Sequence, residues 1–81
     1  MRVVREIPHQ QCKITIYAWN NRYLIKIEDG LLEQTFKISQ TDVFDDEELI
    51  RIIDAEFIQQ ALTRFSEMAR SLDQARARTE P

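Results

Sequence analysis

Residues 12–39, CKITIYAWNNRYLIKIEDGLLEQTFKIS, decide the fold of this chain of 81 residues. β-branched and aromatic side chains alternate with polar ones along this stretch, which predicts antiparallel strands with one buried face. The dipeptides Asn20-Asn21 and Asp29-Gly30 interrupt the alternation, and their residues tolerate the positive φ of two-residue hairpin turns. We therefore expect strands at about 12–19, 22–28 and 31–39.

These two hairpins place the apolar side chains on a single face of the sheet. Around the first expected loop Ile16 faces Ile25, and around the second Ile27 faces Leu32. Gln34 is the polar exception, opposite Ile25. A slip of one residue would send every side chain to the other face, so the agreement between the hairpins supports both registers. The expected inner face consists of Ile14, Ile16, Tyr23, Ile25, Ile27, Leu32, Phe36 and Ile38.

The segment before this stretch predicts one more strand. RVVREI, at 2–7, is rich in β-branched residues and is followed by Pro8. Proline cannot donate to a β-ladder, so it is expected to end the strand.

Helical patterning begins after Ser39, where the apolar period changes to 3.6. Asp45, followed three residues later by Glu48, has the spacing of a capping box. A helix over 46–77 would be about 48 Å long, against about 26 Å for an eight-residue strand. We therefore expect either a break near Asp54 or an end that overhangs the sheet. The tail at 78–81 has no apolar anchor and is expected to fray.

The predicted fold class is α+β, a four-stranded antiparallel β-meander followed by one long C-terminal α-helix packed on one sheet face. It forms a single small domain over residues 1–81. The net charge of −3 divides into +2 for residues 1–40 and −5 for residues 41–81, so a whole-domain basic footprint for nucleic acid is absent. No apolar run reaches the roughly 18 residues of a membrane span, and no signal peptide is evident. The cytoplasm is the expected location.

His9 and Cys12 are the only histidine and the only cysteine, three positions apart in the sequence. A zinc site needs three or four ligands, and a nucleophile needs an oriented base; neither pattern is complete here. The favoured interpretation is structural, with Cys12 as a small core hydrophobe. The acidic run from Asp42 to Glu48 lacks the EF-hand spacing, so the helix dipole explains it, with an acidic docking surface as the alternative. We expect no catalytic residues, no cofactor and no metal.

The second face of the sheet is the expected binding surface, because aromatic and cationic side chains alternate on it. Three interpretations stay open: a solvated face, a protein–protein contact, or a platform for single-stranded nucleic acid. Leu49 and Ile52 fall outside the apolar stripe of the helix and are candidates for self-association. The candidate binding face comprises Lys13, Tyr17, Trp19, Arg22, Leu24, Lys26 and Lys37.

The order of four strands and then a helix resembles the repeat unit of the PUR-alpha and Whirly group of single-stranded nucleic-acid binders. The resemblance is one of topology and carries no sequence motif, so no functional positions follow from it. The leading hypothesis is a small non-enzymatic cytoplasmic interaction module that forms a homodimer. The alternative is a weak single-stranded nucleic-acid binder that uses the open sheet face. A partner protein is a further option, and no membrane association is expected.

Overall fold

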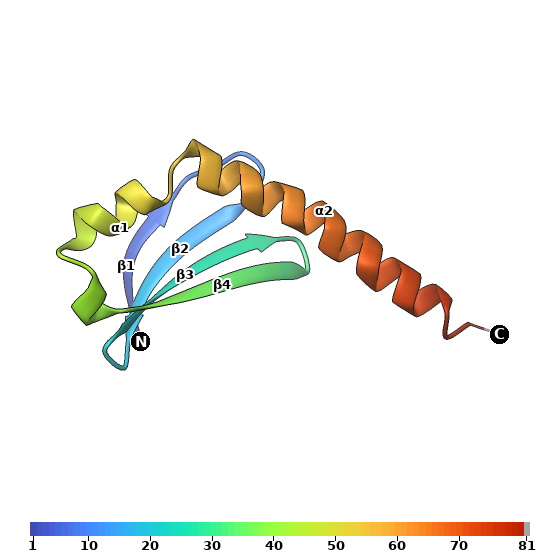
Figure 1. Cartoon of the computed structure of the whole chain (residues 1–81), viewed down its shortest axis with the longest axis horizontal. Coiled ribbons are helices and arrows are strands. Elements are labelled where there is room, and N and C mark those ends of the chain that lie inside the picture. Colours follow the sequence, from blue (N-terminus) through green and yellow to red (C-terminus); the bar gives the residue numbers. More distant parts are fainter. Residues whose placement is uncertain (81) are drawn as a thin grey trace.

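The computed structural model of the chain describes residues 1–80 and contains one open antiparallel sheet with helices on one face (Figure 1). The strands follow one another in space in the order β1-β2-β3-β4. The predicted α+β meander is confirmed; the predicted frayed tail ends at Pro81, which lies outside the described residues. The elements are β1 (Arg2–Ile7), β2 (Lys13–Trp19), β3 (Arg22–Asp29), β4 (Leu32–Ser39), the short 3₁₀ helix η1 (Gln40–Asp42), α1 (Asp46–Ile52) and α2 (Ala55–Ala77).

The hairpin between β2 and β3 has the predicted register. Ile16 pairs with Ile25 and Tyr17 with Leu24. Both loop residues have positive φ, 53° at Asn20 and 61° at Asn21. A type I′ turn requires this conformation, and asparagine adopts it at lower cost than most residues.

The hairpin between β3 and β4 differs from the prediction by two residues. Asp29 pairs with Leu32, and Ile27 pairs with Gln34 rather than with Leu32. The loop is Gly30-Leu31, with φ of 61° at Gly30 alone. Glycine at the first central position is the arrangement of a type II′ turn, so Asp29 keeps an extended conformation and remains in the strand. Because the shift is even, every side chain stays on its predicted face.

The helical layer is broken at Ile53 and Asp54, which confirms the predicted break near Asp54. Asp45 caps α1 by accepting the Glu48 N–H at 2.9 Å, and Glu48 accepts the Phe44 N–H in return at 2.6 Å. Asp54 caps α2 by accepting the Phe57 N–H at 2.8 Å. Each cap satisfies backbone donors that a helix start leaves free, which explains why two helices begin where these aspartates stand.

The core lies between the inner sheet face and the two helices, and it includes Leu49, whose side chain is 0% exposed. The expectation that Leu49 is free for self-association is therefore wrong. The break before α2 lets α1 turn independently of the α2 stripe, so Leu49 points into the core while Ile52 remains 38% exposed. The buried cluster is Ile14, Ile16, Ile25, Ile27, Leu49, Ile53, Ala61 and Phe65.

Gln34, the polar exception on the inner face, fastens α2 to the edge strand β4. Its Nε2 donates to the Ala61 carbonyl at 2.8 Å, and its Oε1 accepts from Arg64 Nε at 2.8 Å. The Arg64 guanidinium also lies 5.7 Å from the centroid of the Phe36 ring. Gln34 therefore has partners for both ends of its amide, as a partly buried polar group requires.

Candidate functional site

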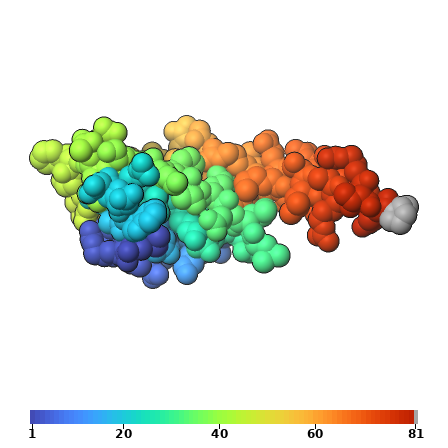
Figure 2. Space-filling model, turned by 90° about the horizontal axis from the view of Figure 1, so that it is seen from below, coloured from blue at the N-terminus to red at the C-terminus, as the bar shows by residue number. Residues whose placement is uncertain are grey.

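Two surfaces of the molecule are candidates for function. The first is the outer face, defined as the sheet face turned away from α1 and α2. Figure 2 looks onto this side: the strands, blue to green, form the surface, and the last turns of α2, in red, extend beyond them. The second is the α2 groove, defined as the groove between this overhanging part of α2 and the start of β4.

The outer face carries its side chains in cross-strand rows. Tyr17, Leu24 and Lys37 form one row, and Trp19 and Arg22 form the next, toward the β2–β3 turn. The structure thus brings five of the seven predicted residues into one cluster, which we call the aromatic patch: Tyr17, Trp19, Arg22, Leu24 and Lys37.

The other two predicted residues lie outside this cluster. Lys26 is in the next row and forms an ion pair with Glu33 at 3.7 Å. Lys13 lies farther along the face, paired in register with Glu28. The acidic side chains of β3 and β4 therefore gather toward the β3–β4 turn, away from the aromatic patch.

Burial within the aromatic patch is uneven, although no element of residues 1–80 covers this side of the sheet. Trp19 is 50% exposed, whereas Leu24 is 9% exposed. Beside them lies a hollow of about 260 Å³, lined by Met1, Tyr17, Leu24, Lys26, Glu33 and Thr35. Thr15, which the sequence analysis did not single out, is 1% exposed, and its Oγ1 lacks a hydrogen-bond partner within the described chain.

The α2 groove exists because the apolar seam of α2 is longer than the sheet beneath it. Ile58, Ala61, Phe65 and Met68 pack on the core. The seam then continues at the same spacing to Leu72, which is 50% exposed, and to Ala75. The groove of about 680 Å³ is lined by Leu32, Gln34, Arg64, Glu67, Met68, Ser71, Leu72 and Ala75.

An overhang was one of the two alternatives expected from the sequence, but self-association was assigned to Leu49 and Ile52, so the α2 groove was not predicted. The groove could have been predicted from two features of the sequence, the continued spacing of the apolar stripe to Ala75 and the length of the helix. With α1 separated, α2 alone is about 34 Å long, still longer than an eight-residue strand.

His9 and Cys12 do come close together, but their environment favours a structural role. His9 Nδ1 accepts the Gln11 N–H at 3.1 Å and lies 3.7 Å from Cys12 Sγ. Burial raises the pKa of the Cys12 thiol, and the Asp29 carboxylate raises it further. A thiol held neutral at physiological pH is a poor nucleophile. Within residues 1–80 no group of three His, Cys, Asp or Glu side chains could hold a metal ion.

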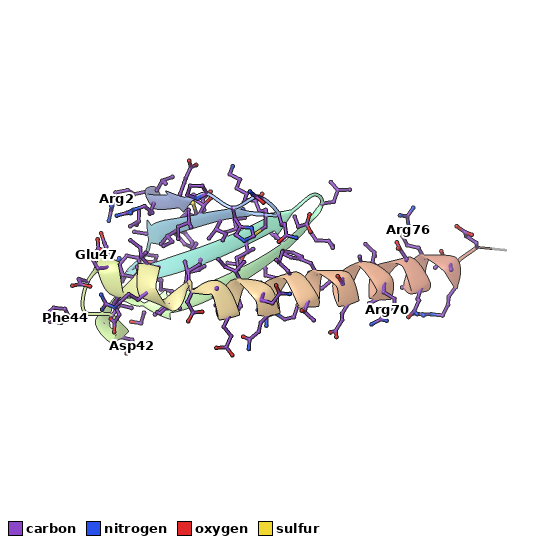
Figure 3. All side chains as sticks on the ribbon, turned by 90° about the horizontal axis from the view of Figure 1, so that it is seen from above. Arg2, Asp42, Phe44, Glu47, Arg70 and Arg76 are labelled. Carbon is purple, nitrogen blue, oxygen red and sulfur yellow. The ribbon has the colours of Figure 1, made fainter. Side chains whose placement is uncertain are left out.

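The acidic run is used mainly to start α1 and hold it on the sheet. Asp46 accepts a hydrogen bond from the Tyr23 hydroxyl at 3.2 Å, and Glu47 lies 3.8 Å from the Arg5 guanidinium. Burial raises the pKa of Tyr23, and the charge and hydrogen bond of Asp46 raise it further. Phe44 remains almost fully exposed at this end of the molecule, far from Arg70 and Arg76 on the overhang (Figure 3).

Comparisons with protein-family models, with curated proteins and with solved structures found no match. In particular, no solved structure supports the topological resemblance to the PUR-alpha and Whirly group. Among residues 1–80, no helix combines the length and the apolar character that crossing a membrane requires.

Proposed function

We propose that the protein is a small interaction module that forms a homodimer through the α2 groove. The observation that carries this proposal is the continuation of the α2 seam past its own sheet, at Leu72 and Ala75. An amphipathic helix is stabilised mainly by burying its apolar face. Here the last turns of that face line an apolar groove with Leu32 of β4.

A second copy of the chain is the proposed occupant of the α2 groove, because the apolar seam of α2 has the spacing of a helix–helix contact. Apolar side chains recur at alternating steps of three and four residues from Ile58 to Ala75, the spacing of a and d positions in a coiled coil. A second α2 carries the same seam by definition. In an antiparallel pair centred between Asp73 and Gln74, Leu72 of each copy lies level with Ala75 of the other.

The antiparallel pairing uses the same surface of both copies. The contact is isologous, so it closes at two copies rather than growing into a filament.

The dimer is expected to be weak. The uncovered part of the seam runs from about residue 69 to 77, roughly 14 Å of helix. Stable specific interfaces bury about 800 Å² on each partner, which a contact of this length does not reach unaided. The dimer should therefore dissociate on dilution.

Binding rather than catalysis is the proposed activity, and the cytoplasm the proposed location. The raised pKa of Cys12 supports a non-enzymatic role, since it removes the best candidate nucleophile. A free thiol is compatible with the reducing cytoplasm, where cysteines remain unpaired.

Sedimentation equilibrium over a concentration series tests the dimer. The expected result for the wild type is a mass that rises from 9.7 kDa toward twice that value with concentration. Leu72→Glu should remain monomeric throughout. Gln74→Glu adds the same charge about 160° around the helix and should dimerise as the wild type does.

Two outcomes contradict the proposal. One is a wild-type monomer at high micromolar concentration. The other is a dimer that Leu72→Glu leaves intact, which would place the interface on another surface. Far-UV circular dichroism of both variants should match that of the wild type. A loss of dimer in Leu72→Glu then reports the loss of the contact rather than unfolding of α2.

A further inference from the structure

We propose that the aromatic patch binds single-stranded nucleic acid, with bases stacked on Trp19 and Tyr17 and phosphates held by Arg22 and Lys37. This site lies on the outer face, away from the α2 groove, and it does not depend on dimer formation.

The first support is the arrangement of rings on an uncovered sheet. Trp19 is half exposed, and Tyr17 lies in the adjacent row on the same face, beside Leu24, whose burial gives the patch a closed apolar floor. Exposed aromatic side chains on a flat sheet are stacking platforms for unpaired bases. The hollow next to Tyr17, about 260 Å³, is smaller than the pockets that take drug-sized ligands and suits a single planar ring.

The second support is charge complementarity. Within residues 1–80, Arg22 and Lys37 form no ion pair, whereas Lys26 is neutralised by Glu33. The patch thus presents positive charge without a local counter-ion, which a phosphate backbone supplies.

Most acidic residues lie away from the aromatic patch, although the net charge is −3. On the outer face, Glu28 and Glu33 lie toward the β3–β4 turn, at the far end from Trp19, and Glu6 of β1 lies beside Thr15, one row from Tyr17. Much of the remaining negative charge belongs to the start of α1, which packs on the opposite side of the sheet (Figure 1). The Debye length is about 8 Å at physiological ionic strength, so distant carboxylates are largely screened from a bound strand.

Trp19 is the only tryptophan, so its fluorescence reports directly on the patch. The probe is a single-stranded oligothymidylate, titrated at low salt. The expected result is quenching, with affinity that falls as salt rises; two phosphate contacts give a log–log slope of about −1.4. An acidic peptide of similar length and charge is titrated in parallel and should bind more weakly.

Variants separate stacking from charge. Measured by anisotropy of a labelled oligonucleotide, Trp19→Ala should weaken binding by about 5- to 150-fold, and Trp19→Phe should restore much of it. Arg22→Gln should reduce the salt slope by about 0.7. Arg70→Gln removes the same charge from the exposed surface of α2 and should leave affinity and slope unchanged. Leu72→Glu should also bind normally, because the groove is a separate site.

Three results would overturn the proposal. The first is fluorescence that does not change with oligonucleotide at low salt. The second is binding that Trp19→Ala does not weaken, which would place any nucleic-acid contact elsewhere. The third is equal or tighter binding of the acidic peptide, which would assign the patch to a protein partner instead.

Discussion

Replacing Leu49 by alanine is the sharpest test of how the helical layer packs. Leu49 is completely buried in the core, whereas the sequence pattern placed it on the surface. Truncating a buried leucine removes its transfer free energy and leaves a cavity, at a cost of about 2–5 kcal/mol. A domain of this length has a free energy of unfolding of roughly 4–12 kcal/mol, so the loss is a large fraction of the total.

Ile52→Ala is the matched control, because Ile52 belongs to the same helix and is exposed. Its cost should stay below about 1 kcal/mol, since it is a surface substitution and alanine is the better helix former. Urea unfolding followed by circular dichroism and by Trp19 fluorescence measures both free energies. A difference of at least about 1 kcal/mol between the variants is expected. Equal small losses would mean that α1 does not pack on the sheet through Leu49.

Three further predictions concern single interactions. Gln34→Ala should lower the free energy of unfolding by about 1–3 kcal/mol, because Arg64 loses its acceptor; Gln74→Ala, on the exposed side of α2, should change it little in the same urea assay. The pKa of Tyr23 is raised in the folded state, so the unfolded state loses this proton first as pH rises, and the free energy of unfolding should fall through and above pH of about 10. Tyr23→Phe should show a shallower fall when unfolding is measured across that range. An identical fall would contradict the role of Tyr23 in this pH dependence. At pH 8, iodoacetamide should alkylate Cys12 more slowly in the folded protein than in the unfolded chain, and Asp29→Asn should speed the reaction of the folded protein. Equal rates in the folded and unfolded states would contradict the raised pKa of the thiol.

The sheet could be predicted from the sequence because local chemistry and side-chain pattern agree there. Asn20 and Asn21 both accept positive φ, so the first loop and its register follow together. At the second turn, Asp29 and Gly30 are compatible with either of two loops. The alternation cannot separate registers that differ by two residues, since both leave the apolar side chains inside. The buried face of each strand was therefore predictable, whereas the residue pairs of the β3–β4 hairpin were not.

The helices show a different limit. Asp54 was recognisable as a cap, but a cap fixes only where a helix begins. The rotation of α1 depends on how it meets the sheet, through Leu49 and the contact of Tyr23 with Asp46. These are tertiary contacts that periodicity along one helix does not contain. The partners of Gln34 on α2 belong to the same class.

The candidate sites were likewise predictable only in part. The residues of the aromatic patch were found from alternation alone, because side chains on one strand face share it whatever else packs around them. The state of the cations depends on contacts between rows. In the observed register Glu33 stands opposite Glu28 and reaches Lys26 diagonally at 3.7 Å, while Lys37 lies beside Leu24.

The α2 groove is a consequence of lengths rather than of any motif. Because α1 covers the sheet near the β2–β3 turn, α2 begins over the middle of the sheet and passes its edge before its seam ends (Figure 1). A helix of about 34 Å cannot then keep all its apolar residues over strands of about 26 Å. If the seam had evolved only to pack on this sheet, polar residues would suffice after Met68. Leu72 and Ala75 stand there at the seam spacing, which is the reason to seek the surface that covers them on a second copy.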